Sequence, residues 1–213
     1  MVGYTIPPED RGSQLSDLGH LPTAYQIAHA LDGRALGRRT IVHQTGITES
    51  TVRTHLNKLR EAGYVKMDKA GTSLTAEGWA FFGPVVERVS LVPDIALDGL
   101  SLGGHQAAAL VDGAEADLPT TLRLRDSAVR EGAPGALLLV KRDGKWALND
   151  DDRPLAERDP VDAAHINEIA RDRSGTGLIV TFGATPRVAR RALWRVIVEL
   201  IPPTHPPSLT RRS

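Results

Sequence analysis

Residues 46–65 read GITESTVRTHLNKLREAGYV, and this stretch decides how the first half of the chain folds. Gly46 permits a sharp turn, and Thr48 is a favourable N-cap for a helix that we expect over residues 49–62. Apolar side chains at helical spacing give this helix one face to bury, formed by Val52, Leu56 and Leu59. Residues 64–67 then alternate as in a strand, so the stretch predicts a turn, an amphipathic helix and the start of a hairpin.

The flanking residues predict a compact helical unit around this stretch. Three further helices are expected, over residues 21–31, over residues 40–45 and from about residue 76 onward. Gly33 ends the first of them, and Thr75 caps the last. Gly83-Pro84 is expected to kink this last helix or to end it early. Residues 72–74 return as the second strand of the hairpin, after a turn at residues 69–71.

The outward face of the helix over residues 49–62 has the side chains that reading duplex DNA requires. The major groove admits an α-helix, and its base edges are read by short polar and guanidinium groups. Arg53 is the candidate for a bidentate contact to guanine, and Asn57 for a base edge or a phosphate. The entry to the second helix suits phosphates, and the hairpin suits the DNA backbone or a minor groove. The predicted DNA-binding residues are Arg38, Arg39, Thr40, Thr48, Ser50, Thr51, Arg53, Thr54, Asn57, Lys58, Lys66, Lys69, Thr72 and Ser73.

The distribution of charge favours this interpretation, although the whole chain is neutral. The 26 basic and 26 acidic side chains exclude a globally basic nucleic-acid binder. Between residues 34 and 82, however, basic side chains outnumber acidic ones by eight to four, and an acidic stretch from Asp150 to Asp162 compensates in the second half. The alternatives are a polar face that is only solvated and a scaffold that grips a protein partner, and the basic segregation favours DNA over both.

Residues 46–65, followed by Leu74-Thr75-Ala76-Glu77-Gly78, resemble the core of archaeal and bacterial winged helix-turn-helix transcription regulators of the MarR-like groups. The resemblance covers about fifty residues, roughly a quarter of the chain. It implies a winged helix-turn-helix head in a transcription regulator such as a repressor. It also implies a homodimer and a palindromic operator on double-stranded DNA.

The second half predicts a separate α+β domain. Apolar runs indicate strands over residues 106–111, 136–141, 146–148 and 177–182. Helices are expected over residues 126–131 with an extension back toward Leu122, over residues 163–173 and from Pro186 to about Leu200. Asp143-Gly144 is a strong hairpin signal between two of the strands. The resulting βαββαβ order is that of a ferredoxin-like sandwich, and Lrp-type regulators are similar in topology, with such a domain for assembly and effector binding.

These patterns divide the chain into two domains of an α+β protein. A winged helix-turn-helix domain is expected over residues 16–92, and an effector-binding or dimerisation domain over residues 104–201. The Gly-containing passage 94–104 is the expected boundary, and residues 1–15 and 202–213 are expected to be flexible ends.

Candidate ligand residues in the second half are fewer and less specific. Arg125 and Asp126 could edge a small-molecule effector site, and Arg187 and Arg191 could bind an anion from the last helix. The simpler interpretation, a capped helix and a solvated arginine face, is favoured for both pairs. Asp150-Asp151-Asp152 is likewise interpreted as a hydrated loop rather than a cation site.

The remaining features exclude several classes of protein. The absence of cysteine rules out disulfides and thiolate metal sites, and scattered histidines predict no metal centre. No apolar run is long enough for a membrane span and no secretion signal is apparent, so we expect a cytoplasmic protein. No nucleotide-binding or nucleophile motif is present, so we expect neither an enzyme nor a bound cofactor.

The composition and the motifs also bear on the source organism and on alternative functions. Scarce Asn, Gln and Met beside plentiful Arg suit a thermophile, although a GC-rich genome has the same effect. A role in replication, partition or a mobile element fits the same DNA-binding head as well as transcription does. A small-molecule enzyme built on the second domain is the least favoured alternative.

Overall fold

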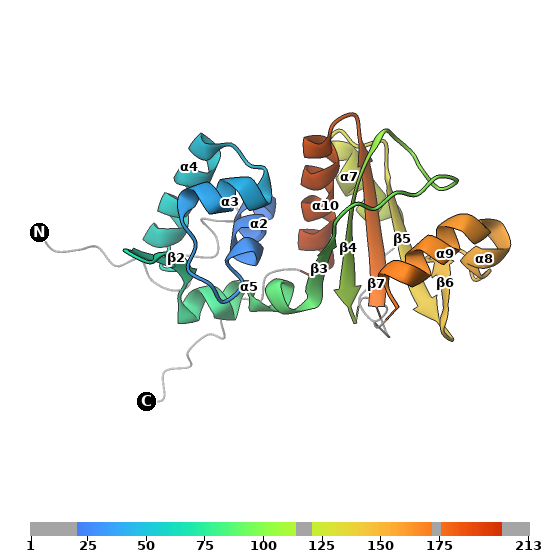
Figure 1. Ribbon diagram of the computed structural model, residues 1–213, viewed down its shortest axis with the longest axis horizontal. Helices are drawn as coiled ribbons and strands as arrows, with labels where there is room; N and C mark the ends of the chain where they lie inside the picture. The colour runs from blue at the N-terminus through green and yellow to red at the C-terminus, as the bar shows by residue number, and fades with distance from the viewer. Residues whose placement is uncertain (1–20, 114–120, 172–175, 202–213) are drawn as a thin grey trace, which may run out of the picture. The chain divides into compact units, whose positions relative to one another are not determined.

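The computed structural model describes residues 21–113, 121–171 and 176–201 (Figure 1). The expected flexible ends, 1–15 and 202–213, lie outside these residues. The described residues divide into two compact units, 21–87 and 88–201. Within these ranges, none of the helices has the length and apolar character needed to cross a membrane.

The described residues of the N-terminal unit form four helices and a two-stranded hairpin. Its elements are α2 (Leu21–Leu31), α3 (Arg38–Thr45), α4 (Glu49–Glu61), β1 (Val65–Asp68), β2 (Gly71–Leu74) and α5 (Ala76–Arg88). Every element expected from the sequence is present, and α3 begins two residues earlier than predicted. The expected early end of α5 is wrong, because this helix continues through Pro84 to Arg88.

Four aromatic side chains hold the N-terminal unit together. Tyr25 of α2 lies edge-on to Phe82 of α5, with ring centroids 5.1 Å apart. Tyr64, which precedes β1, stacks on Phe81 at 4.9 Å. Gly78 allows α5 to approach the backbone of Tyr64, since a Cβ atom at this position would lie 2.0 Å from the Tyr64 carbonyl oxygen. Burying each phenylalanine contributes about 1.5–3 kcal/mol, so this cluster fixes α2 and α5 against the hairpin.

The C-terminal unit contains a five-stranded sheet with the order β3-β4-β7-β5-β6. Its strands are β3 (Val89–Val92), β4 (His105–Asp112), β5 (Ala136–Arg142), β6 (Lys145–Leu148) and β7 (Thr176–Gly183). Its helices are α7 (Thr121–Arg130), α8 (Leu155–Arg158), α9 (Pro160–Ile169) and α10 (Pro186–Leu200). The hairpin signal at Asp143-Gly144 is confirmed, since both residues have positive φ and Arg142 pairs with Lys145.

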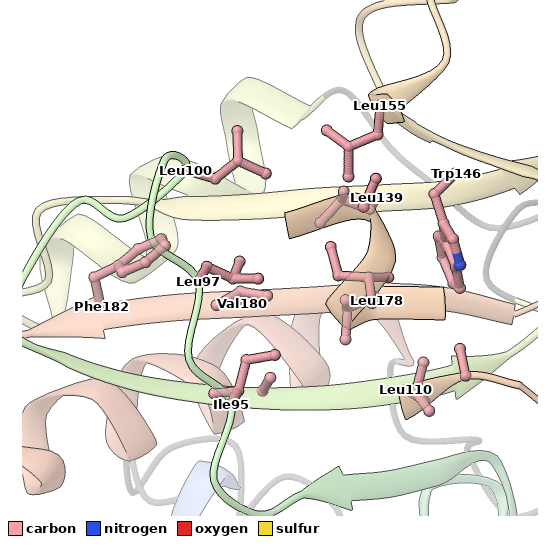
Figure 2. Packing of buried hydrophobic residues seen from close by; sticks show 14 residues of the cluster. Ile95, Leu97, Leu100, Leu110, Leu139, Trp146, Leu155, Leu178, Val180 and Phe182 are labelled. Atoms are coloured by element: carbon pink, nitrogen blue, oxygen red, sulfur yellow. The ribbon is translucent and has the colours of Figure 1, made fainter. Parts of the chain in front are cut away.

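Helices cover both faces of this sheet (Figure 1). On one face, α8, α9 and the segment 93–104 bury a cluster that includes Trp146, Leu178 and Val180 (Figure 2). On the other face, α10 packs against α7, β4 and β7. The hydroxyl of Thr181 in β7 donates to the Ala189 carbonyl oxygen of α10 at 2.7 Å. The unit therefore has three layers, with the sheet in the middle.

This arrangement corrects the expected ferredoxin-like topology. The predicted order of elements is present, but the first of the predicted strands, β4, lies next to the last one, β7, and not next to the third, β6. A ferredoxin-like sandwich has both crossover helices on one face of its sheet, whereas here α7 lies on the face that α10 covers and α9 lies on the opposite face. The order of elements along a chain does not specify which strands pair, so the sequence pattern could not separate the two folds.

The division between the units lies earlier than composition indicated. Strand β3 pairs with β4, so residues 89–92 belong to the C-terminal sheet. The Gly-containing passage 94–104 is part of the same unit, because its side chains Ile95, Leu97 and Leu100 are buried in the sheet's core. The buried carboxylate of Asp162 fixes this passage by accepting hydrogen bonds from two of its backbone N–H groups, each at 2.9 Å.

Candidate nucleic-acid interface

The turn between α3 and α4 is fixed by side-chain hydrogen bonds. Gly46 ends α3 in the left-handed region at φ 67°, and its N–H donates to the Val42 carbonyl. The buried Thr45 hydroxyl donates to the Ile41 carbonyl at 2.7 Å and accepts from the Ile47 N–H at 3.2 Å. Gln26 of α2 donates to the Thr45 carbonyl at 2.8 Å. The start of α4 is thereby held in one orientation relative to α2 and α3.

A network of hydroxyl groups begins α4. Thr48 is the N-cap, and its Oγ1 accepts from the Thr51 N–H at 3.4 Å. The Thr48 and Thr51 hydroxyls are 2.8 Å apart, and the Ser50 hydroxyl lies 3.3 Å from Thr48 Oγ1. The hydroxyl of Thr54 donates to the Ser50 carbonyl at 3.0 Å. Thr48 and the half-buried Thr51 therefore stabilise the start of the helix. The side chains of Ser50, Arg53 and Thr54 are exposed to solvent.

The solvent face of α4 has short polar side chains along its centre and cationic side chains along its edges. Its opposite face is buried by Val52, His55, Leu56 and Leu59. At about 100° per residue, Ser50, Thr54 and Asn57 lie within roughly 30° of the direction opposite this stripe. All three are exposed. Arg53 and the half-exposed Lys58 flank them on either side, so the predicted reading residues share one surface.

The arginines at the start of α3 differ in their availability. Arg38 Nη2 lies 3.1 Å from Glu49 Oε1 in the first turn of α4, and both side chains are well exposed. An exposed pair of this kind contributes little to stability, so its cation stays accessible to another anion. Arg39 and Thr40 are exposed, and within the described residues neither Arg39 nor Arg53 forms an ion pair.

A third chain segment supports the β1–β2 hairpin. Leu36 exchanges two backbone hydrogen bonds with Thr72, each 2.9 Å long. Gly71 makes this approach possible, since it has φ 130° and a Cβ atom there would lie 2.7 Å from the Leu36 carbonyl group. The turn presents Lys69, and Asp68 Oδ1 accepts from the Ala70 N–H at 2.8 Å. The Leu36 contact was not predicted from the sequence, in which Gly71 is its only local signal.

The hairpin register corrects one predicted contact. Lys66 lies opposite Ser73, and these two side chains share the solvent face with partial or full exposure. Thr72 alternates to the other face and is only 5% exposed, so it packs inside the unit and is not presented to DNA. The hairpin surface therefore consists of Lys66, Lys69 and Ser73.

The ligand residues predicted in the C-terminal unit do not form one site. Arg125 lines a cavity of about 220 Å³ with Thr121, Asp150 and Arg158, whereas Asp126 is exposed and does not line it. Arg191 Nε lies 2.7 Å from Glu131 Oε2, and its Nη2 donates to the Glu131 carbonyl. This arginine is thus bound within the unit, while Arg187 is exposed.

Arginines also neutralise the acidic loop 150–152. Arg153 Nη2 lies 2.7 Å from Asp151 Oδ2, and Arg142 Nη1 lies 3.1 Å from Asp152 Oδ1. Hydrogen bonds from Arg153 lower the pKa of Asp151 to about 2. Within the described ranges, no three histidine or acidic side chains gather as metal ligands. The loop is therefore an ion-paired surface.

Comparisons with known proteins divide the chain in the same way as its structure. Residues 22–87 match the family model described as the CggR N-terminal DNA binding domain, a range that lies inside the N-terminal unit. Residues 102–200 match a family described as a domain of unknown function, DUF4443.

One solved structure is similar to most of the chain. It is described as hypothetical protein PH0730 from Pyrococcus horikoshii OT3, and it is 26% identical with a TM-score of 0.59. The similarity covers 83% of this chain and 91% of the archaeal one. No curated protein matches the sequence.

Proposed function

We propose that this protein is a sequence-specific regulator of transcription that binds double-stranded DNA through its N-terminal unit. In this proposal the unit is a winged helix-turn-helix, α4 is the reading helix and the β1–β2 hairpin is the wing. The observation that carries the proposal is the surface of α4, on which Ser50, Thr54 and Asn57 are exposed between Arg53 and Lys58. The match of residues 22–87 to a DNA-binding family supports it.

Each part of this surface has a role that follows from its chemistry. Ser50, Thr54 and Asn57 offer hydroxyl and amide groups to base edges in the major groove. Arg53 donates to the O6 and N7 atoms of a guanine, which is the commonest specific contact to DNA. Arg39 is exposed in the first turn of α3 and is a candidate for a phosphate contact. Glu61 ends the same face of α4 and repels phosphates, so the N-terminal part of the helix enters the groove.

The wing contacts the DNA backbone next to the major groove. Lys69 at the turn and Lys66 on the solvent face of β1 are exposed, and Ser73 lies opposite Lys66. These groups carry little sequence information, and they fix the orientation of α4 on the duplex. Thr48 and Thr51 position the reading helix without contacting DNA themselves, because their hydroxyls hold the first turn of α4.

We further propose that the regulator acts as a homodimer in the cytoplasm. One reading helix of 13 residues reaches only a few base pairs, whereas regulatory sites are read as two half-sites about one helical turn apart. In this proposal the C-terminal unit supplies assembly or effector sensing. Sedimentation of the full chain tests the dimer, and a monomer at all concentrations would contradict it.

The test of DNA reading is a binding titration with the full chain. Selection from random duplexes should enrich one motif, and binding to it should weaken as salt rises, with a log–log slope near −4 per chain if about four cations contact phosphates. A variant that combines Arg39→Gln, Lys66→Gln and Lys69→Gln should flatten this slope by about three. A protein scaffold would show neither an enriched motif nor a salt-dependent affinity for duplexes.

A further inference from the structure

The helix α4 begins with an acidic side chain, which opposes the binding of DNA to this helix. Glu49 is the first residue of α4, and its side chain is 62% exposed. A carboxylate at this position stabilises the helix itself, because it lies at the positive end of the helix dipole. Next to DNA, however, the same carboxylate repels phosphates and competes with them for the cations around it.

The nearest of these cations along the helix is Arg53. Glu49 and Arg53 are four positions apart, so they are neighbours on the helix surface, and a glutamate on the N-terminal side is the favoured orientation for such a pair. An arginine held by this carboxylate could not present its donors to the O6 and N7 atoms of a guanine. In the structure, Arg53 is exposed and forms no ion pair within the described residues. The Glu49 carboxylate is therefore held elsewhere.

The side chain that holds Glu49 belongs to the other helix of the turn. Arg38, the first residue of α3, places its Nη2 atom 3.1 Å from Glu49 Oε1. The hydrogen bonds of Thr45 and Gly46 fix the turn between the two helices, so the two side chains start from fixed positions. A guanidinium has five N–H donors. Arg38 can thus bind Glu49 through one nitrogen and still contact a phosphate through the others.

We propose that Arg38 is a positioning residue that binds Glu49 and thereby keeps Arg53 free to read guanine. This inference rests on the proposed function, because it requires α4 to be the reading helix. It assigns Arg38 an effect on base specificity, although its own side chain contacts no base. A phosphate contact alone would instead make Arg38 contribute equally to all duplexes.

The first test needs no DNA and follows the arginine Nε–H signals of the full chain by ¹H–¹⁵N NMR. Arg53→Ala identifies the Arg53 signal by its loss. Arg38→Gln should shift this signal, because the released Glu49 pairs with Arg53, and adding Glu49→Gln should return it toward its original position. Arg39→Gln removes the same charge from the next residue of α3 and should not move it. An Arg53 signal that does not respond to Arg38→Gln overturns the inference.

The second test measures base discrimination by the bound protein. It compares affinity for the selected duplex with affinity for a duplex in which adenine replaces one guanine, namely the guanine at which Arg53→Ala relaxes the sequence preference. Phosphate contacts act on both duplexes and cancel in this ratio. Arg38→Gln should lower the ratio about two- to five-fold, as expected for the loss of an exposed ion pair, and adding Glu49→Gln should restore it. Arg38→Lys, which keeps the charge that binds Glu49, should retain the ratio.

The controls separate this inference from the proposed function. Arg39→Gln should weaken binding to both duplexes by the same factor and leave the ratio unchanged. A protein that enriches no motif, or a ratio that Arg53→Ala does not lower, contradicts the proposed function and this inference with it. If Arg53→Ala lowers the ratio but Arg38→Gln does not, only the role of Arg38 is overturned. A loss in Arg38→Gln that Glu49→Gln fails to restore has the same meaning.

Discussion

The two units of this protein use their charged side chains in different ways. In the C-terminal unit, several arginines are bound by neighbouring carboxylates, as in the pairs of Arg142 with Asp152 and of Arg191 with Glu131. In the N-terminal unit, Arg38 pairs with Glu49, and the cations of α4 and the hairpin face solvent. Cations without a protein partner can neutralise phosphates, which agrees with the proposal that the N-terminal unit binds DNA.

The largest expected effect tests whether the units are separate folding units. Phe82 and Phe182 are both fully buried, one in each unit, and each change to alanine should lower the free energy of unfolding of its own unit by about 3–5 kcal/mol. Trp79 reports on the N-terminal unit, and Trp146 and Trp194 report on the C-terminal one. Denaturant titrations monitored through these tryptophans should show one transition shifted in each variant. A common shift of both transitions would show that the units unfold together.

The next effect concerns the reading surface. Arg53→Ala should cost about 1–3 kcal/mol at the selected site and relax the sequence preference at one position. Arg153→Ala removes the same charge from the C-terminal unit, where Asp151 binds it, and should leave DNA affinity unchanged. Fluorescence anisotropy with the selected duplex measures both variants. Equal losses would mean that net charge, and not the surface of α4, determines affinity.

A smaller effect is expected at the hairpin. Lys69→Ala should weaken binding to selected and random duplexes by a similar factor and reduce the salt slope by about one, because a phosphate contact carries no base information. The same titrations, repeated at several salt concentrations, give both quantities. Loss of affinity at the selected duplex alone would place Lys69 on a base edge instead.

The smallest effect lies in the acidic loop of the C-terminal unit. Asp151 has a pKa of about 2 because Arg153 donates hydrogen bonds to its carboxylate. A lowered pKa means that the pair stabilises the fold above the ordinary pKa of Asp and that this contribution is lost as pH falls toward 2. Arg153→Gln should raise the pKa of Asp151 toward its ordinary value, as followed by the carboxyl signal in an NMR titration. An unchanged pKa would show that the pair does not persist in solution.

Local patterns predicted the N-terminal unit well. The helix α2 has the predicted bounds, and Thr48 caps α4 as its residue type indicated. His55, next to the apolar stripe, is buried, and its Nδ1 lies 2.9 Å from the Thr51 carbonyl oxygen. These features depend on residues within a few positions of each other, and such short-range preferences can be inferred from sequence.

Features set by distant residues could not be predicted in this way. Thr72 is buried on the inner face of the hairpin, and its backbone pairs with Leu36, a residue far away in the sequence. The segment around Leu97 has the composition of a linker, yet Asp162 binds it from 64 positions away. The strand order in the C-terminal sheet could not be predicted either, since it depends on which strands pair and not on the residue pattern within each strand.

The entry of α4 into the major groove is the central claim, and cleavage of DNA from a residue of this helix tests it directly. The chain has no cysteine, so Glu61→Cys, at the exposed end of the reading face, can carry an iron chelate alone. With the selected duplex bound, we predict strand cleavage inside the recognised motif across its major groove. The same reagent on Ala164→Cys, exposed on α9, should cleave nothing there. A duplex that stays bound without cleavage from residue 61 would contradict the assignment of α4 as the reading helix.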